Sequence, residues 1–438
     1  MALFLNNVED DYETDFGLFN LIQTLKYKVF RPLFSTPKLK PLILVPGLGA
    51  STIYATWNKS EEQTPTSKFL DGAGVFEASS EWSCRTLQTE WVPIWSRETA
   101  NLTGVGKYCL SNNLHVVYDA QQNDVANSPG VRTYVSPGWE LATGCYNDFI
   151  KALESVGYTK ESLGNNPTNL LCANYDFRRM CGRVLSEYIA ELTVLIESSV
   201  TQNGQRAILV GHDLGSQIAN YFLGQMPKEW KDAYIDKFIV ISGTFGGCPK
   251  ALRTLLSPGD PLDRETQRNF CGLLWMLPCP EIYGDLPLVN YRGVDYTAKQ
   301  IPQLLHYARY GETNAIHANI VHNLQMQSMR SPGVSVSIFS GNKVPTESNY
   351  AYDKTLLDPP VRISPKQDNE LGYRVPRIEY PSNFNGDGTV PKFVLEHPAQ
   401  WSRYQREPVI YSFYDGLGHN EVLSRKDSVQ DIIGSILS

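Results

Sequence analysis

Three observations predict an α/β fold with a mostly parallel central sheet. The chain has 438 residues, of which 42% are hydrophobic and 19% charged, so it can bury a large core. Short apolar, β-branched runs ending near Gly or Asp are typical of strands buried on both faces of a sheet. They lie at 41–47, 169–177, 206–213, 237–243, 334–342 and 408–416. Helical patterns at 147–155, 184–200 and 217–226 separate several of these runs, as βαβ crossovers require.

The first segment, 1–38, is expected to be an amphipathic extension. After an acidic opening, residues 16–34 alternate apolar side chains with Lys26, Lys28 and Arg31, and Pro32 ends the pattern. One interpretation is a helix docked on the body of the protein. The other is a helix on a membrane surface, since cationic amphipathic segments bind anionic lipid. The main domain is then expected over 39–435.

Two long stretches interrupt the strand and helix rhythm of this domain. The stretch at about 55–145 is rich in Trp, Tyr, Gly and Pro, and the stretch at about 249–332 has apolar runs of its own. Insertions of this size between core strands usually form caps or lids over a site. We therefore expect a membrane-binding or cap region in the first and a lid or cap in the second.

The composition excludes several classes of partner and site. Lys and Arg total 39 against 46 Asp and Glu, and the net charge of -7 leaves no basic stripe for nucleic acid. No apolar stretch approaches the ~20 residues that span a bilayer, and the first residues lack the basic start of a cleavable signal. The 8 cysteines form no CxxC pair, and HExxH is absent, so no metal site is expected.

A catalytic constellation follows the expected strand at 206–210. The strand enters GHDLG at 211–215 and then a helix, which is the context of a nucleophile elbow, with Asp213 at the position usually held by Ser. Asp387 follows in a Gly-rich turn, and His419 comes just after the last strand. Each piece alone has an ordinary structural interpretation. Nucleophile, acid and His in this order, however, match the α/β-hydrolases and predict a catalytic site.

The turn that closes the first core strand completes this expectation. VPGLG at 45–49 lies where one amide of an oxyanion hole should come from, and the Leu214 N–H is expected to be the other donor. As a dinucleotide-binding motif, GLGAST at 47–52 lacks its third glycine. Neither an organic cofactor nor a metal is therefore expected.

These motifs together resemble one family, that of lecithin-cholesterol acyltransferase and lysosomal phospholipase A2, which includes the phospholipid-diacylglycerol acyltransferases. The resemblance covers roughly residues 40–435. It rests on PLILVPGLGAS at 41–51, YDFRR at 175–179, the elbow, WKD at 230–232 with Ile235-Asp236 and FGG at 245–247, NGDGTVP at 385–391, and His419. The resemblance implies an α/β-hydrolase fold with a cap and a small membrane-binding lobe. It also implies that Asp387 orients His419 and that the amides of Leu48 and Leu214 bind the oxyanion.

The resemblance further implies a disulfide and a lipid surface in the small lobe. Cys84 and Cys109 match the family's disulfide pair. The nearby side chains are interpreted as lipid or membrane contacts, since Trp suits the interface, although ordinary core packing is the alternative. They are Trp82, Trp91, Ile94 and Trp95. The expected partners are a phospholipid membrane surface or lipid particle, a lipid acyl donor and an alcohol acceptor, without nucleic acid, and the chain is expected to be a monomer.

The compartment is left open by the same features. The cysteine pair and the sequons at Asn58 and Asn101 favour a lumenal, lysosomal or extracellular site, yet no cleavable signal is visible.

Asp213 departs from the family pattern. In the family this residue is a Ser that takes an acyl group from phospholipid and passes it to water or to an alcohol such as a sterol or diacylglycerol. A carboxylate would instead give a mixed anhydride, and its charge would repel the developing oxyanion. Removal of a triad nucleophile costs on the order of a million-fold in rate. We therefore expect this chain to be inactive or nearly so in acyl transfer.

Two alternatives remain for Asp213. GHDLG also looks like the elbow of epoxide hydrolases and haloalkane dehalogenases, in which an Asp attacks an sp³ carbon and water then hydrolyses the alkyl ester. A non-catalytic lipid-binding relative, with Asp213 and His419 paired at the base of a lipid groove, is the other. The retention of Asp387 and His419 argues against simple decay. A single replacement in an otherwise intact chain explains the pattern with the fewest assumptions.

Overall fold

The core of the protein is a six-stranded sheet in the order β15-β12-β9-β8-β1-β7. The computed structural model describes residues 38–59, 86–99, 104–162, 167–257, 264–356, 362–364 and 385–438. All neighbouring strands of this sheet pair in parallel, which confirms the predicted α/β class. The strands are β1 (Leu42–Val45), β7 (Leu170–Cys172), β8 (Ala207–His212), β9 (Ile235–Ile241), β12 (Val336–Asn342) and β15 (Val409–Asp415).

The two faces of this sheet pack into separate hydrophobic cores. Alternate residues of a strand point to opposite faces, and in β1 Ile43 belongs to one buried cluster while Leu44 belongs to the other. Helices α4 (Gly182–Asn203) and α5 (Leu214–Gln225) contribute to the first cluster. Helices α3 (Asn147–Ser155) and α15 (Lys426–Leu437) contribute to the second. Because both faces are covered, every residue of β1 and β8 is buried.

The three helices expected between core strands are α3, α4 and α5, and the structure confirms all of them. The longest, α4, ends where Gly204 adopts a left-handed conformation with φ of 67°. The remaining short helices of the core region are α6 (Lys228–Tyr234), α14 (Lys392–Leu395), η9 (His397–Arg403) and η10 (Glu421–Leu423).

The first inserted stretch folds mainly into antiparallel strands. The order β3-β2-β6 makes a three-stranded sheet, and β4 pairs with β5 as a hairpin. The elements are β2 (Ile53–Asn58), β3 (Leu87–Trp95), α2 (Gly104–Leu114), β4 (Val116–Asp119), β5 (Asp124–Asn127) and β6 (Val131–Val135). Its role as a membrane-binding lobe stays a prediction.

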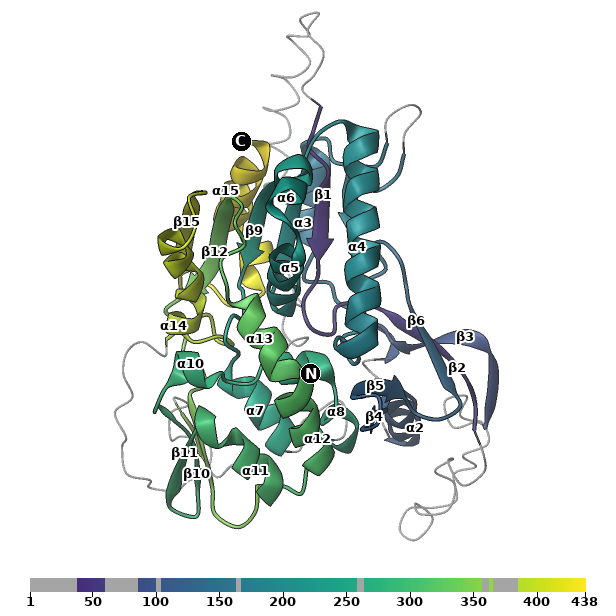
Figure 1. Ribbon diagram of the computed structural model, residues 1–438, viewed down its shortest axis with the longest axis vertical. Helices are drawn as coiled ribbons and strands as arrows, with labels where there is room; N and C mark the ends of the chain where they lie inside the picture. The colour runs from purple at the N-terminus through teal and green to yellow at the C-terminus, as the bar shows by residue number, and fades with distance from the viewer. Residues whose placement is uncertain are drawn as a thin grey trace, which may run out of the picture.

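The second inserted stretch is mostly helical. Its helices are α7 (Pro249–Leu256), α8 (Arg264–Gln267), α9 (Cys271–Trp275), α10 (Pro280–Tyr283), η6 (Ala298–Gln300), α11 (Ile301–Tyr307), α12 (Gly311–Ile316), the π-helix η7 (His317–Val321) and α13 (His322–Ser328). A sheet in the order β11-β10-β13-β14 joins it, from β10 (Pro287–Tyr291), β11 (Val294–Thr297), β13 (Asn349–Tyr352) and β14 (Arg362–Ser364). Both inserted stretches lie beyond the carboxyl ends of the central strands (Figure 1).

Some expectations fall outside the described residues. The amphipathic extension is one of them, since description begins at residue 38. Trp82, Cys84 and Asn101 are also outside. Within the described ranges, none of the helices has the length and apolarity that crossing a bilayer requires.

Candidate active site

Asp213 stands on a sharp turn between β8 and α5. Its backbone has φ of 53° and ψ of -126°, which is unusual for a residue with a side chain. The flanking glycines are required by close backbone contacts. A Cβ on Gly211 would lie 2.6 Å from Ser216 Cα, and one on Gly215 would lie 2.1 Å from the Val45 carbonyl oxygen. The structure therefore has the strand, tight turn and helix that the GHDLG sequence predicts.

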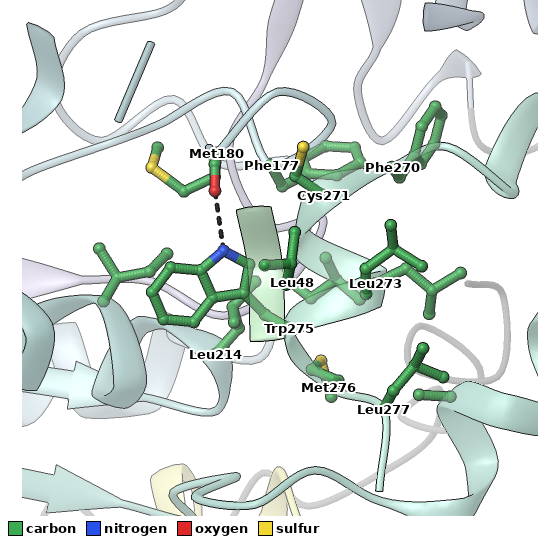
Figure 2. Close-up of a cluster of buried hydrophobic side chains, with 14 of the residues drawn as sticks. Leu48, Phe177, Met180, Leu214, Phe270, Cys271, Leu273, Trp275, Met276 and Leu277 are labelled. Atoms are coloured by element: carbon green, nitrogen blue, oxygen red, sulfur yellow. Dashed lines mark hydrogen bonds between the residues drawn. The ribbon is translucent and has the colours of Figure 1, made fainter. Parts of the chain in front are cut away.

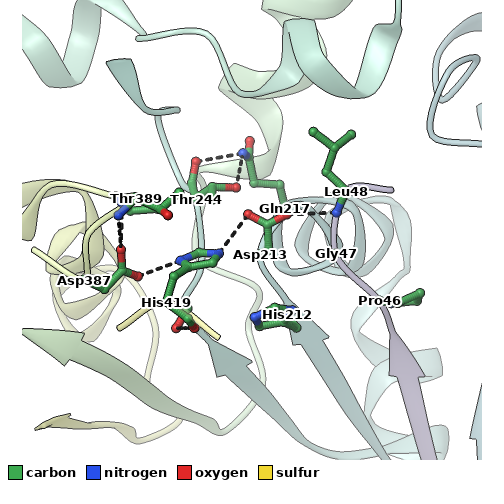
Figure 3. Close-up of polar contacts among 12 residues, drawn as sticks. Pro46, Gly47, Leu48, His212, Asp213, Gln217, Thr244, Asp387, Thr389 and His419 are labelled. Carbon is green, nitrogen blue, oxygen red and sulfur yellow. Dashed lines mark hydrogen bonds and ion pairs between the residues drawn. The ribbon is translucent and has the colours of Figure 1, made fainter. Parts of the chain in front are cut away.

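The structure brings Asp213, His419 and Asp387 into one hydrogen-bonded row (Figure 3). His419 Nδ1 lies 2.7 Å from Asp387 Oδ2, and His419 Nε2 lies 3.2 Å from Asp213 Oδ1. The side chains are buried, with exposed fractions of 3% for Asp213, 1% for Asp387 and 6% for His419. Asp213 and His419 follow the core strands β8 and β15, and the turn of Asp387 is bridged to Val344 just after β12, so all three meet at the carboxyl edge of the parallel sheet.

The Asp387 carboxylate is fixed by its own turn. Its Oδ1 accepts the N–H groups of Thr389 at 3.0 Å and Val390 at 2.7 Å, which leaves Oδ2 facing His419. The Thr346 hydroxyl oxygen accepts the N–H groups of Gly386 and Gly388 on either side of Asp387. The Gly-rich sequence is thus a turn that aims one carboxylate oxygen at the imidazole.

The charges of the row favour an imidazolium between two carboxylates. Burial lowers the pKa of His419, but the charges and hydrogen bonds of Asp387 and Asp213 outweigh burial and raise it to about 10. Burial also raises the pKa of Asp213, but the hydrogen bond and charge of His419 bring it below its usual value. At neutral pH Asp213 is therefore ionised and His419 is protonated.

The two expected oxyanion donors meet the Asp213 carboxylate. The Leu48 N–H donates to Asp213 Oδ2 at 2.8 Å, and the Leu214 N–H helps to lower the pKa of Asp213. Asp213 also precedes α5, and the amino end of a helix stabilises a negative charge. The turn after β1 and the start of α5 are therefore arranged to hold an anion, and the side chain of Asp213 supplies it.

Residues of the second inserted stretch cover this site. The side chains of Leu48 and Leu214 lie in a buried cluster with Trp275 and neighbouring residues of α9 (Figure 2). A Cβ on Gly272 would lie 2.9 Å from Leu48 Cδ1 and 3.0 Å from Leu214 Cδ2, so α9 rests directly on both leucines. The Trp275 indole N–H donates to the Met180 carbonyl at 2.8 Å. The packing of α9 on Leu48 and Leu214 thus helps to shield the site residues from solvent.

A disulfide that the sequence did not predict holds this cover. Cys181, just before α4, is bonded to Cys271 in α9, 90 residues further along the chain. The YDFRR sequence at 175–179 also connects the segment before α4 to α9. Arg178 pairs with Asp176 at 2.6 Å, and the Arg178 carbonyl accepts the Cys271 N–H at 2.8 Å. No spacing pattern links the two cysteines, so nothing local in the sequence could have paired them.

The side chains that were expected to contact lipid differ in their exposure to solvent. Trp91 is 42% exposed and remains a predicted membrane contact. Ile94 and Trp95 are 0% and 1% exposed, which favours the alternative of core packing for both, and their assignment as lipid contacts stays a prediction. The end of β3 turns inward, where the Trp95 indole N–H donates to the Gly49 carbonyl at 2.6 Å. Cys109 is disulfide-bonded, and its pairing with Cys84 stays a prediction.

Tyr146 and His212 also belong to the site, although sequence reasoning missed both. The Tyr146 hydroxyl oxygen accepts the Gly47 N–H at 2.8 Å and lies 2.8 Å from His212 Nδ1. His212 sits inside the elbow motif, which was a usable signal. Tyr146 had none, because it reaches the site only through tertiary folding.

Comparison with known proteins shows that the chain is similar to lipid acyltransferases. Residues 92–286 match the family model described as lecithin:cholesterol acyltransferase. The chain is 26% identical to lecithin-cholesterol acyltransferase-like 1 of Arabidopsis thaliana, over 90% of this chain and 89% of the relative. It is 26% identical to phosphatidylcholine-sterol acyltransferase of Mus musculus, over 87% and 83%. It is 27% identical to the Homo sapiens protein of that name, over 74% and 73%.

Among solved structures, the Tle4-Tli4 complex contains a chain of similar fold. The two superpose with a TM-score of 0.51 at 10% identity, covering 91% of this chain and 98% of that one. At this identity the likeness concerns the fold alone.

Proposed function

We propose that the site is built for acyl transfer from a glycerophospholipid, because residues 92–286 match the lecithin:cholesterol acyltransferase family model, similar acyltransferases align over most of the chain, and the chain has the α/β-hydrolase fold. The transfer would pass through an acyl-enzyme to water, a sterol or diacylglycerol. In this chain Asp213 occupies the nucleophile position and holds the site inactive or nearly so. The family supports lipid acyl transfer or hydrolysis, and the roles of individual residues are our proposal.

One observation carries the proposal: both oxygens of Asp213 are engaged by the groups that acyl transfer needs. Oδ1 faces His419 Nε2, and Oδ2 accepts the Leu48 N–H. A hydroxyl in place of Oδ1 would lie beside the imidazole that must take its proton. Removal of Oδ2 would free the amide that must bind the oxyanion. The remaining machinery thus fits a serine better than the aspartate present.

The proposed roles follow from the charges. Asp387 orients His419 and stabilises its protonated form during transfer. His419 is the general base, a role that requires a neutral imidazole before the reaction. With Asp213 present the pKa of His419 is about 10, so the imidazole is already protonated at neutral pH. Asp213 therefore blocks the site twice, since it cannot form a useful acyl ester and it keeps the base protonated.

The test compares the chain as it stands with Asp213→Ser on phosphatidylcholine vesicles. The released fatty acid reports transfer to water, and acyl esters formed with added cholesterol or diacylglycerol report transfer to an alcohol. We expect turnover with Asp213→Ser and little or none with the unchanged chain. Asp213→Ala is the matched control, because it removes the carboxylate without supplying a nucleophile.

The outcomes separate the interpretations. If Asp213→Ser is active and Asp213→Ala is not, the site performs acyl transfer through the side chain at this position. If none of the three proteins turns over phospholipid while all bind the vesicles, the proposal fails and a lipid-binding relative is favoured. Normal turnover by the unchanged chain contradicts the proposed role of Asp213.

A second candidate, attack by Asp213 on an sp³ carbon, is favoured by the same Leu48 contact. Asp213 Oδ1 would form a C–O bond while the leaving group departs with the electron pair of its bond to carbon. The carbonyl oxygen of the resulting ester would be Oδ2, which already accepts the Leu48 N–H at 2.8 Å. Loss of the Asp213 charge would lower the pKa of His419, so the imidazole could deprotonate a water for hydrolysis.

Isotope labelling distinguishes this candidate. In ¹⁸O-water a single turnover through an aspartyl ester leaves ¹⁸O in the Asp213 carboxylate, because water attacks the carbonyl carbon and the original oxygen leaves with the alcohol. Mass spectrometry of the peptide that contains Asp213, after reaction with an alkyl halide or epoxide, measures this. An unlabelled peptide after product has formed rules the ester mechanism out.

A further inference from the structure

The turn at 46–49 is held by three aromatic side chains that come from three different segments. Each makes one hydrogen bond to its backbone, and each side chain is 2% exposed or less. The bonds run from the Tyr175 hydroxyl to the Pro46 carbonyl at 2.8 Å, from the Gly47 N–H to the Tyr146 hydroxyl at 2.8 Å, and from the Trp95 indole to the Gly49 carbonyl at 2.6 Å.

These bonds fix the backbone on both sides of Leu48, which is the one residue of the turn that they do not contact. Its N–H is the group that points at Asp213 Oδ2. The turn lies beyond the end of β1, so the ladder of the central sheet does not fix its direction. Within the turn, the Ala50 N–H donates to the Gly47 carbonyl at 3.1 Å. The direction of the Leu48 N–H therefore depends on the side chains that hold its neighbours.

We propose that Trp95, Tyr146 and Tyr175 are positioning residues that aim the Leu48 N–H at a developing oxyanion. This inference rests on the proposed acyl transfer. Oxyanion donors act by being fixed in place before charge develops, and a displacement of about 1 Å can cost about a hundredfold in rate. A flexible turn would lose this advantage even with the donor still present. The three side chains supply the rigidity from outside the turn.

Tyr146 has a second role, because it joins the turn to the elbow. Its hydroxyl oxygen accepts the Gly47 N–H, which leaves the hydroxyl proton free to be donated to His212 Nδ1. Burial, followed by the charge of His419, lowers the pKa of His212 to about 4, so this imidazole is neutral and can accept. One hydroxyl thus fixes the distance between the backbone segments that carry Leu48 and Asp213.

The space between these segments is already minimal. A Cβ on Gly47 would lie 2.9 Å from Asp213 Cβ and 3.2 Å from His212 Nδ1. The turn therefore cannot move toward the elbow, and the bonds to Tyr146, Tyr175 and Trp95 oppose movement away from it, together with the Leu48 bond to Asp213 and the packing of α9 on Leu48. Loss of the Tyr146 hydroxyl is expected to let the turn shift outward.

The first measurement is hydrogen exchange of the segment 42–52 in the chain as it stands. We compare Tyr146→Phe with Tyr158→Phe, which removes a similarly buried hydroxyl that donates to the Lys40 carbonyl at 3.0 Å. Loss of one hydrogen bond alone would speed exchange at Gly47. Positioning predicts faster exchange at Leu48 and Ala50 as well, in Tyr146→Phe and not in Tyr158→Phe. An unchanged Leu48 overturns the inference, whatever the activity.

The second measurement separates positioning from a general loss of structure. In the Asp213→Ser background, Tyr146→Phe should lower kcat on phosphatidylcholine by about 10–100-fold, less than the full loss of a donor. KM should stay within about twofold, because the ground-state ester does not need the oxyanion donor. Binding of a diether phospholipid, which has no carbonyl, should not change. Tyr158→Phe should leave kcat unaltered.

These results distinguish the inference from the proposed function. If Asp213→Ser shows no turnover, the proposed function fails, while the exchange data still decide whether Tyr146 fixes the turn. If Asp213→Ser is active and Tyr146→Phe speeds exchange at Leu48 without lowering kcat, the proposed function stands and the positioning role is overturned. A fall in diether binding together with kcat also overturns it, since that pattern indicates structural loss.

Discussion

The Leu48 N–H donates a hydrogen bond of 2.8 Å to Asp213 Oδ2. The donor predicted to stabilise an oxyanion is therefore already bound to an anion of the protein itself. The second oxygen of Asp213 lies 3.2 Å from His419 Nε2, so the same side chain also engages the predicted base. The Asp213 carboxylate therefore binds permanently to groups that are suited to a transient negative charge.

The first prediction concerns the pH dependence of stability. The pKa of His419 is raised to about 10 by Asp387 and Asp213 against the effect of burial. This contribution is complete below the unfolded pKa of about 6.5 and is lost as pH rises through about 10, with a total of up to about 5 kcal/mol. The lowered pKa of Asp213 contributes in the opposite range and is lost as pH falls.

Urea unfolding of the chain and of Asp213→Asn between pH 7 and 10 measures this contribution. The unfolding free energy should fall more steeply with pH in the unchanged chain, because Asn removes one of the two charges that hold the proton. Titration of Lys and Tyr cancels in the comparison. Parallel curves would mean that Asp213 does not raise the pKa of His419.

The second prediction assigns Asp387 and His419 in the Asp213→Ser background. His419→Ala should lower kcat by about 10⁶-fold, since the nucleophile loses its base. Asp387→Asn should lower it by about 10⁴-fold, because the imidazole then adopts the wrong tautomer. Steady-state hydrolysis of phosphatidylcholine measures both, with the exposed His306→Ala as control. Loss of less than tenfold in His419→Ala would remove this residue from the mechanism.

The third prediction compares two glycines of α5. Gly215→Ala should destabilise the protein by about 1–3 kcal/mol, because its Cβ would lie 2.1 Å from the Val45 carbonyl oxygen. Gly224→Ala should stabilise it by about 0.5–1 kcal/mol, since no atom lies within 4 Å of that Cβ and alanine favours a helix. Denaturant unfolding of both variants tests the close approach of β1 to the elbow. Equal effects of the two substitutions would contradict it.

The fourth prediction tests the membrane contact assigned to Trp91. This side chain is 42% exposed and packs edge-on against Tyr134, with ring centroids 4.8 Å apart. Trp91→Ser should weaken binding to phosphatidylcholine vesicles by about tenfold, or about 1.4 kcal/mol. Tyr404→Ser removes another aromatic residue that is 74% exposed and serves as the matched control. Vesicle sedimentation reports binding, and equal losses in both variants would exclude a specific surface at Trp91.

Much of the fold could be predicted because parallel strands carry a strong local pattern. Each of the six apolar runs became a strand, since burial on both faces demands continuous hydrophobic residues over β1 and β8. Asp213, Asp387 and His419 were found for a similar reason. Asp213 and His419 stand at the carboxyl ends of parallel strands, which meet at one edge, and the Gly-rich turn with Asp387 was recognised by its place in the chain order; its bridge to Val344 after β12 is a tertiary contact.

The remaining features depend on contacts that no local pattern encodes. Cys181 and Cys271 pair because α9 folds back over the start of α4. Trp is a residue type that is common at membrane interfaces, yet the strand of Trp95 ends in the core, and its indole N–H donates to the Gly49 carbonyl. Tyr146 reaches Gly47 across 99 positions of sequence. Such tertiary contacts are decided by packing of distant segments, which a single sequence does not show.

The most direct test of the central claim is the mass of the protein after rapid mixing with phosphatidylcholine vesicles and acid quenching. With Asp213→Ser we predict a fraction of protein that is heavier by one fatty acyl group, with the group mapped to the peptide containing position 213. The unchanged chain and Asp213→Ala should show no such adduct. If Asp213→Ser binds the vesicles and remains unmodified at every time point, or if the unchanged chain is acylated equally, the account of Asp213 as the block in an acyl-transfer site is contradicted.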